Sequence, residues 1–136
     1  MLCLHIASIG SMKHLFALLF LGLVNLGPAP AMAAELIMVE EQGCYWCGRW
    51  NEEIAPIYPK TTEGKYSPLR RIDIHDPLPT DINFVASLYF TPTFVLIENG
   101  QEIGRIEGYP GEDFFWGLLG RMLTEHTSYC GGSTEC

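Results

Sequence analysis

The sequence predicts a single α/β domain. Short apolar runs typical of buried strands alternate with longer segments in which apolar residues recur at helical spacing. An Asn99-Gly100 pair between two strand-like runs also indicates a tight hairpin. Together these observations predict the element order β-α-β-α-β-β-α, in a domain large enough for one modest core.

The first half of the domain is expected to form a strand, a helix and a second strand. The apolar run 36–39 is read as a short buried strand that ends at the polar turn 40–43. A helix is expected from Cys44 to about Tyr58, with Pro56 introducing a kink. Its apolar residues at helical spacing are Trp50, Ile54 and Ile57. Alternation of apolar and polar residues from Leu69 to Ile74 suits the second strand.

The second half is expected to begin with a helix and to end with one. Thr80 can cap a helix from Asp81 to about Tyr89, after two prolines that break the chain. The strongly apolar run 93–97 and the segment 101–107 then form the hairpin. A final amphipathic helix is expected from Gly111 to about Glu125.

Residues 1–33 have the pattern of an export signal. Lys13 and His14 precede an apolar run from Leu15 to Val24, and Ala31-Met32-Ala33 offers small residues before a cleavage site. The run is shorter than the roughly 20 residues of a membrane span. We therefore expect cleavage before Ala34 and no stable membrane association afterwards, with a retained N-terminal anchor as the alternative. Met12 is an alternative start.

Export and charge limit the classes of partner. Asp and Glu number 16 against 8 Lys and Arg, and all the acidic residues follow residue 33. Such an acidic domain is unsuited to nucleic acid and to anionic membrane surfaces. We expect a bacterial periplasmic location, where paired cysteines tend to form disulfides. No glycine-rich phosphate loop or other cofactor pattern is present in the sequence.

Two cysteines separated by two residues, Cys44 and Cys47, stand where the first helix is expected to begin. Backbone N–H groups and the positive end of the helix dipole favour negative charge at this place. Both effects lower the pKa of a thiol from its usual value of about 8.5. Because the thiolate is the nucleophile in disulfide exchange, the two cysteines are the candidate catalytic residues.

Two other interpretations of the C-x-x-C pair stay open. The first is a structural disulfide in a binding module without catalytic activity. The second is a four-cysteine zinc site formed with Cys130 and Cys136, although the five residues between these two exceed the usual spacing of two to four. A disulfide between Cys130 and Cys136, in a flexible tail of residues 127–136, is expected instead, and no metal site is predicted.

Three stretches of residues 34–126 resemble the thioredoxin family. They are the C-Y-W-C stretch 44–47 after a strand, the F-T-P-T-F-V-L stretch 90–96, and the E-N-G-Q-E-I stretch 98–103 followed by a glycine and a last helix. The resemblance implies a thioredoxin-like fold with a central mixed sheet. It also implies thiol-disulfide oxidoreductase activity.

The resemblance assigns roles to further residues. It implies a cis bond between Thr91 and Pro92 beside the cysteine pair, where the Thr91 backbone can pair with an extended peptide. Tyr45 and Trp46 are expected to join these two in binding the substrate. Glu40 is a candidate proton acceptor, because Met38 occupies the position of the family's buried aspartate. A solvated turn carboxylate is the alternative interpretation of Glu40.

Within the family, the stretch 43–61 resembles the SoxS-type thioredoxins of bacterial sulfur-oxidation operons. This narrower resemblance implies a protein disulfide substrate, namely a cysteine-bearing sulfur-carrier protein that is reduced and so reactivated. Cys44 is expected to attack the partner disulfide and Cys47 to resolve the mixed disulfide. A membrane thiol reductase would then regenerate the dithiol.

Overall fold

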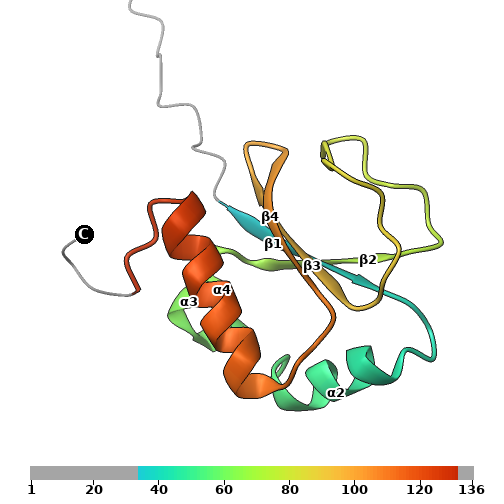
Figure 1. Cartoon of the computed structure of the whole chain (residues 1–136), viewed down its shortest axis with the longest axis horizontal. Coiled ribbons are helices and arrows are strands. Elements are labelled where there is room, and N and C mark those ends of the chain that lie inside the picture. The colour runs from blue at the N-terminus through green and yellow to red at the C-terminus, as the bar shows by residue number, and fades with distance from the viewer. Residues whose placement is uncertain (1–33, 132–136) are drawn as a thin grey trace, which may run out of the picture. The chain divides into compact units, whose positions relative to one another are not determined.

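The structure of the protein is a computed structural model that describes residues 34–131 (Figure 1). The predicted signal peptide and Cys136 lie outside these residues. The described elements, in chain order, are β1 (Glu35–Glu40), α2 (Tyr45–Glu53), the 3₁₀ turn η1 (Tyr58–Lys60), α3 (Thr62–Tyr66), β2 (Leu69–Asp73), β3 (Thr93–Glu98), β4 (Gln101–Glu107) and α4 (Glu112–His126).

The four strands form one mixed sheet in the order β2-β1-β3-β4. β1 runs parallel to β2 and antiparallel to β3, and β3 and β4 form the predicted hairpin. Its turn needs positive φ at two residues, which Asn99 (φ 52°) and Gly100 (φ 73°) supply. The predicted strands and the α/β fold class with a mixed sheet are confirmed.

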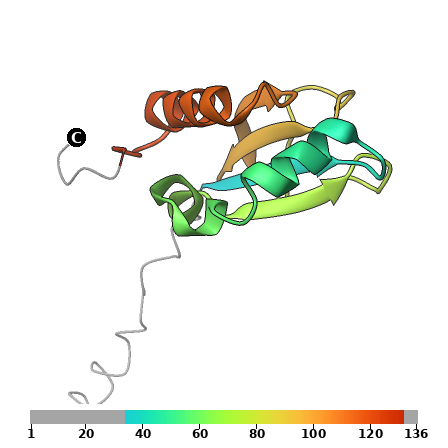
Figure 2. The ribbon, with the colours of Figure 1, turned by 90° about the horizontal axis from the view of Figure 1, so that it is seen from below.

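α2 and α4 pack against the same face of this sheet. The core there centres on three aromatic side chains that are fully buried, Trp50 of α2, Phe94 of β3 and Phe115 of α4. Their ring centroids lie 4.9 to 5.8 Å apart. In Figure 2, α2 crosses in front of the strands. Because the buried side chains of α2 pack against the sheet and α4, the first turn of α2 is held at the end of β1.

The predicted helix from Asp81 to Tyr89 is wrong. Residues 82–88 form an irregular segment that covers the other face of the sheet, where Ile82, Phe84 and Leu88 pack against side chains of β1 and β3. Ile82 and Phe84 are separated by one polar residue, and this spacing suits extended chain better than helix. Asn83 also pairs with Gln101 as an isolated bridge, so tertiary hydrogen bonds replace helical ones.

The helix predicted from Cys44 to Tyr58 is shorter than expected. α2 ends at Glu53, three residues before Pro56, which has no N–H to continue the hydrogen-bond ladder. The chain then forms η1 and the short helix α3, neither of which was predicted. Thr61 caps α3, because its hydroxyl accepts a hydrogen bond from the Gly64 N–H at 3.0 Å. None of the helices in the described part of the chain has the length and apolar character needed to cross a membrane.

Candidate thiol-disulfide active site

Cys44 and Cys47 are joined in a disulfide at the start of α2, with an S–S distance of 2.04 Å and a Cα–Cα distance of 5.2 Å. Gly43, with φ of 83°, makes the turn from β1 into the helix. Cys44 is the N-cap residue, and its Sγ accepts a hydrogen bond from the Cys47 N–H at 3.1 Å. This N–H and the helix dipole stabilise negative charge on the Cys44 sulfur when the bridge is open.

The two cysteines differ in exposure. Cys47 is 3% exposed and belongs to the helix-side core, whereas Cys44 is half-buried. Between them, the side chains of Tyr45 (65% exposed) and Trp46 (52%) project from the first turn of α2, with their rings in edge contact. A partner protein therefore meets the sulfur of Cys44 and these two rings before it meets Cys47.

The Thr91–Pro92 segment lies at the same end of the sheet. Its peptide bond is cis. Thr93, the next residue, pairs with Val39 near the end of β1, and the Pro92 carbonyl accepts a hydrogen bond from the Gly108 N–H at 2.7 Å. Because β1 leads directly into the turn before Cys44, the fold brings the predicted substrate-binding segment to the cysteine pair.

Glu41, a residue that no sequence motif marks, links this segment to the turn. Its carboxylate accepts a hydrogen bond from the Thr91 hydroxyl at 2.7 Å, and its other oxygen lies 3.1 Å from His75 Nε2. Its carbonyl accepts a bond from the Cys44 N–H. The hydrogen bond from Thr91, followed by that with His75, lowers the pKa of Glu41 below its ordinary value. No local sequence pattern marks contacts across 34 and 50 residues.

Glu40, the candidate proton acceptor, is half-buried and forms an ion pair with Arg71 at 2.7 Å. Arg71 also donates to Asn51 Oδ1 at 2.5 Å and lies over the ring of Trp50, 5.5 Å from its centroid. The Glu40 carboxylate thus ties β1 to β2 and, through Arg71, to α2. Its role in proton transfer stays a prediction.

The zinc interpretation gains no support from the described residues. Cys44 and Cys47 are bonded to each other, which leaves no thiolate for a metal in this state. Within residues 34–131, no group of three or more His, Cys, Asp or Glu side chains is arranged to hold a metal ion. Cys130 lies near the end of the described chain and Cys136 beyond it, so their disulfide stays a prediction.

A C-x-x-C disulfide at the start of a helix, on a mixed sheet and beside a proline-containing loop, defines a thiol-disulfide oxidoreductase of thioredoxin-like fold. Among solved structures, the chain is similar to the periplasmic thioredoxin SoxS from Paracoccus pantotrophus in its reduced form. The identity is 49%, the match covers 68% of this chain and 97% of that one, and the TM-score is 0.66. This chain belongs to the thioredoxin family and, within it, to the SoxS type.

Two more distant structures also match. The thioredoxin of Malassezia sympodialis (Mala s 13) is 21% identical, with 71% of this chain and 76% of that one covered and a TM-score of 0.49. Fasciola hepatica thioredoxin is 22% identical, with 67% and 82% covered and a TM-score of 0.48. No protein-family profile matches the chain. No curated protein sequence matches it either.

Proposed function

We propose that this thiol-disulfide oxidoreductase acts in the periplasm and reduces a disulfide on a cysteine-bearing sulfur-carrier protein, which it thereby reactivates. The observation that carries the proposal is the 49% identity over nearly the whole length of a periplasmic SoxS thioredoxin. The export pattern of residues 1–33 supports the location, with cleavage before Ala34. The acidic domain supports a protein partner over nucleic acid.

In the proposed reaction, the Cys44 thiolate attacks one sulfur of the partner disulfide. That S–S bond breaks, the other partner sulfur leaves as a thiolate, and a mixed disulfide forms. The Cys47 thiolate then attacks the Cys44 sulfur, which releases the first partner sulfur. The partner gains two electrons and, with protons, two thiols, while Cys44 and Cys47 become the disulfide seen here.

The assignment of attacker and resolver rests on exposure and on the helix terminus. Cys44 is the more exposed sulfur and accepts the Cys47 N–H, so its thiolate is both accessible and stabilised. Cys47 is buried, so its thiolate meets the adjacent Cys44 sulfur and attacks it once that sulfur is bonded to the partner. Tyr45, Trp46 and the backbone of Thr91 and Pro92 surround the attacked disulfide and bind the polypeptide that carries it.

A reductant must restore the dithiol after each turnover, because the periplasm is kept oxidising. We assign this step to a membrane thiol reductase that exchanges disulfides with the same cysteine pair.

The proposal is tested by trapping in periplasmic extract from a sulfur-oxidising bacterium. Cys47→Ser should accumulate a mixed disulfide with the partner, because the resolving thiolate is missing. Cys44→Ser should form none, and the captured band should contain a sulfur-carrier protein. If only Cys44→Ser captured a partner, the roles assigned to the two cysteines would be wrong. If only unrelated proteins were captured, the assignment of a sulfur-carrier protein as the partner would be wrong.

A further inference from the structure

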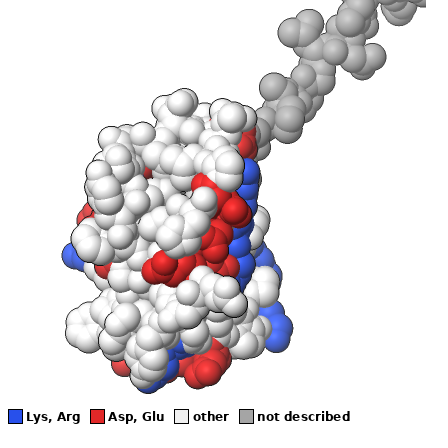
Figure 3. Space-filling model, turned by 90° about the vertical axis from the view of Figure 1, so that its right-hand side faces the viewer, with Lys and Arg blue, Asp and Glu red and all other residues white. Residues whose placement is uncertain are grey.

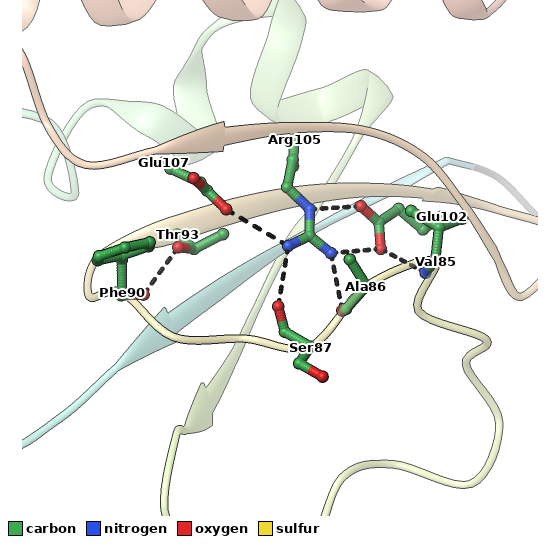
Figure 4. A network of polar contacts seen from close by, with 8 residues as sticks. All are labelled: Val85, Ala86, Ser87, Phe90, Thr93, Glu102, Arg105 and Glu107. Atoms are coloured by element: carbon green, nitrogen blue, oxygen red, sulfur yellow. Dashed lines mark hydrogen bonds and ion pairs between the residues drawn. The ribbon is translucent and has the colours of Figure 1, made fainter.

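The segment between β2 and β3 is fastened to the sheet edge by side chains. β4 is an edge strand, and Asn83 runs beside its first residues, accepting the Glu102 N–H at 3.1 Å and donating to the Gly100 carbonyl at 2.8 Å. Beyond Asn83 the backbone pairing stops. From Val85 onward, the segment is held instead by the side chains of Glu102 and Arg105, both on β4 (Figure 4).

Arg105 uses each of its three guanidinium nitrogens in this contact. Nε and one terminal nitrogen donate to the two oxygens of Glu102 at 2.6 and 2.8 Å. The terminal nitrogens also donate to the carbonyls of Ala86, at 3.1 Å, and Ser87, at 3.3 Å. A carboxylate oxygen of Glu107 lies 3.5 Å from a terminal nitrogen of Arg105. The Val85 N–H donates to the Glu102 carboxylate at 2.9 Å. The planar fork thus binds a carboxylate and two successive carbonyls at once.

This pair, the Glu102–Arg105 clamp, is nearly closed to water. The side chain of Glu102 is 2% exposed and that of Arg105 is 16% exposed. Burying two charges costs free energy that their attraction offsets only with good geometry and further hydrogen bonds. An apolar pair would cover the edge of the sheet at lower cost. The specific result of the clamp is a fixed path for the backbone of residues 85–87.

The fixed backbone leads into two exposed aromatic residues. Tyr89 is 76% exposed and Phe90 is 59% exposed, and Phe90 directly precedes Thr91. The Phe90 carbonyl accepts a bond from the Thr93 hydroxyl at 2.7 Å, so the segment is anchored on both sides of the two rings. The side of the molecule shown in Figure 3, where this segment lies in Figure 1, has a broad uncharged area beside a band in which acidic and basic side chains adjoin, with further charged side chains at its edges.

We propose that the Glu102–Arg105 clamp is a positioning pair that holds Tyr89 and Phe90 as a docking platform for the partner polypeptide. The occupant is an extended segment with apolar side chains beside its disulfide cysteine. Tyr89 and Phe90 continue the chain of Thr91, whose backbone meets the same segment, and exposed aromatic side chains are favoured anchors of protein interfaces. The inference rests on the proposed function, because it concerns the protein substrate of the same cysteine pair.

The platform distinguishes a protein disulfide from a small one. A small disulfide reaches Cys44 without covering Tyr89 or Phe90, whereas a polypeptide loses contacts when these rings move. The test compares second-order rate constants for reduction of insulin and of 2-hydroxyethyl disulfide by the pre-reduced protein. We expect Arg105→Lys, and separately Tyr89→Ala with Phe90→Ala, to lower the insulin-to-small-disulfide ratio about tenfold.

Two controls separate docking from general damage. Phe114→Ala removes an aromatic ring of similar exposure (70%) on α4 and should leave the ratio at the wild-type value. Tyr89→Phe keeps the ring and should do the same. Because Tyr89 and Phe90 are exposed, their substitution tests the platform even if Arg105→Lys fails to fold.

The outcomes distinguish this inference from the proposed function. A wild-type protein that reduces neither disulfide overturns both. A wild-type protein that reduces both disulfides, with a ratio unchanged by the Tyr89 and Phe90 substitutions, overturns the platform alone. An unchanged ratio for folded Arg105→Lys, together with a lowered ratio for the aromatic substitutions, overturns the role of the clamp.

Discussion

One face of the sheet is covered by α2 and α4, and the other by the irregular segment 82–88. The helix-covered face buries a large core around Trp50 and Phe115 and holds the start of α2, where the disulfide lies. The segment-covered face has a smaller apolar cluster, and polar side chains of β4 hold the chain over it. The first face fixes the reactive sulfurs, and the second fixes the path of the chain toward Thr91.

The two halves of the site are stabilised by different forces. Apolar burial positions the cysteine pair, and it depends little on pH. Hydrogen bonds of Glu41, Glu102 and Arg105 position the Thr91 segment, and these depend on direction and charge. Substitutions on the two faces should therefore differ in how much they lower the free energy of unfolding and in how that loss depends on pH.

The largest expected effect is on the helix-covered face. Leu119 of α4 is fully buried, so Leu119→Ala should lower the free energy of unfolding by about 2–5 kcal/mol through lost burial and a cavity. Urea denaturation followed by circular dichroism measures it. A loss under about 1 kcal/mol would show that this face is less tightly packed than the structure has it.

Gly64→Ala should have the next largest effect. A Cβ at this position would lie 1.9 Å from the Tyr58 carbonyl oxygen, which is backbone and cannot turn aside. We expect α3 to shift at a cost of about 1–3 kcal/mol. Gly120→Ala, where a Cβ meets nothing within 4 Å, is the matched control and should leave the urea midpoint equal or higher.

Leu88→Ala is the same leucine-to-alanine substitution as Leu119→Ala, made on the other face of the sheet. Leu88 is only half-buried against its cluster, so the expected loss is about 1 kcal/mol. The same urea titration measures it beside Leu119→Ala. Equal losses for the two leucines would contradict the difference between the faces.

The smallest effect is expected at Glu41 and is visible in its pH dependence. The hydrogen bonds from Thr91 and with His75 lower the pKa of Glu41, so the folded state favours its ionised form. This contribution is present above the unfolded pKa of about 4.3 and is lost as pH falls through the lower folded value. Asp73, which lies nearby, acts in the opposite direction.

Glu41→Gln should therefore be less stable than the wild type at pH 7, with the difference shrinking as pH falls below about 4.3. Urea midpoints at pH 7, 5 and 3 check it. A constant difference over this range would show that ionisation of Glu41 does not stabilise the folded state.

Sequence predicted the elements that have a regular pattern. The strands, α4 and the hairpin turn at Asn99-Gly100 follow from periodicity and turn chemistry, and the C-x-x-C spacing located the reactive pair. The segment 82–88, for which the sequence predicts a helix, is irregular because its structure depends on contacts with β1, β3 and β4. Local sequence carries no record of those contacts.

The same reason explains the missed polar residues. Glu41, Glu102 and Arg105 act across the fold, with partners 17 to 50 residues away. A carboxylate in a turn or an arginine on an edge strand is common on protein surfaces, so neither stands out in a sequence. Their roles become visible only when the chain is folded.

In the proposed reaction, Cys44 presents an accessible thiolate and Cys47 stays buried behind it. Brief treatment of the reduced protein with limiting iodoacetamide, followed by peptide mass spectrometry, tests this directly. We expect Cys44 to be alkylated first, at a pH below the usual thiol pKa, while Cys47 is protected. Equal labelling of the two cysteines, or earlier labelling of Cys47, would contradict it.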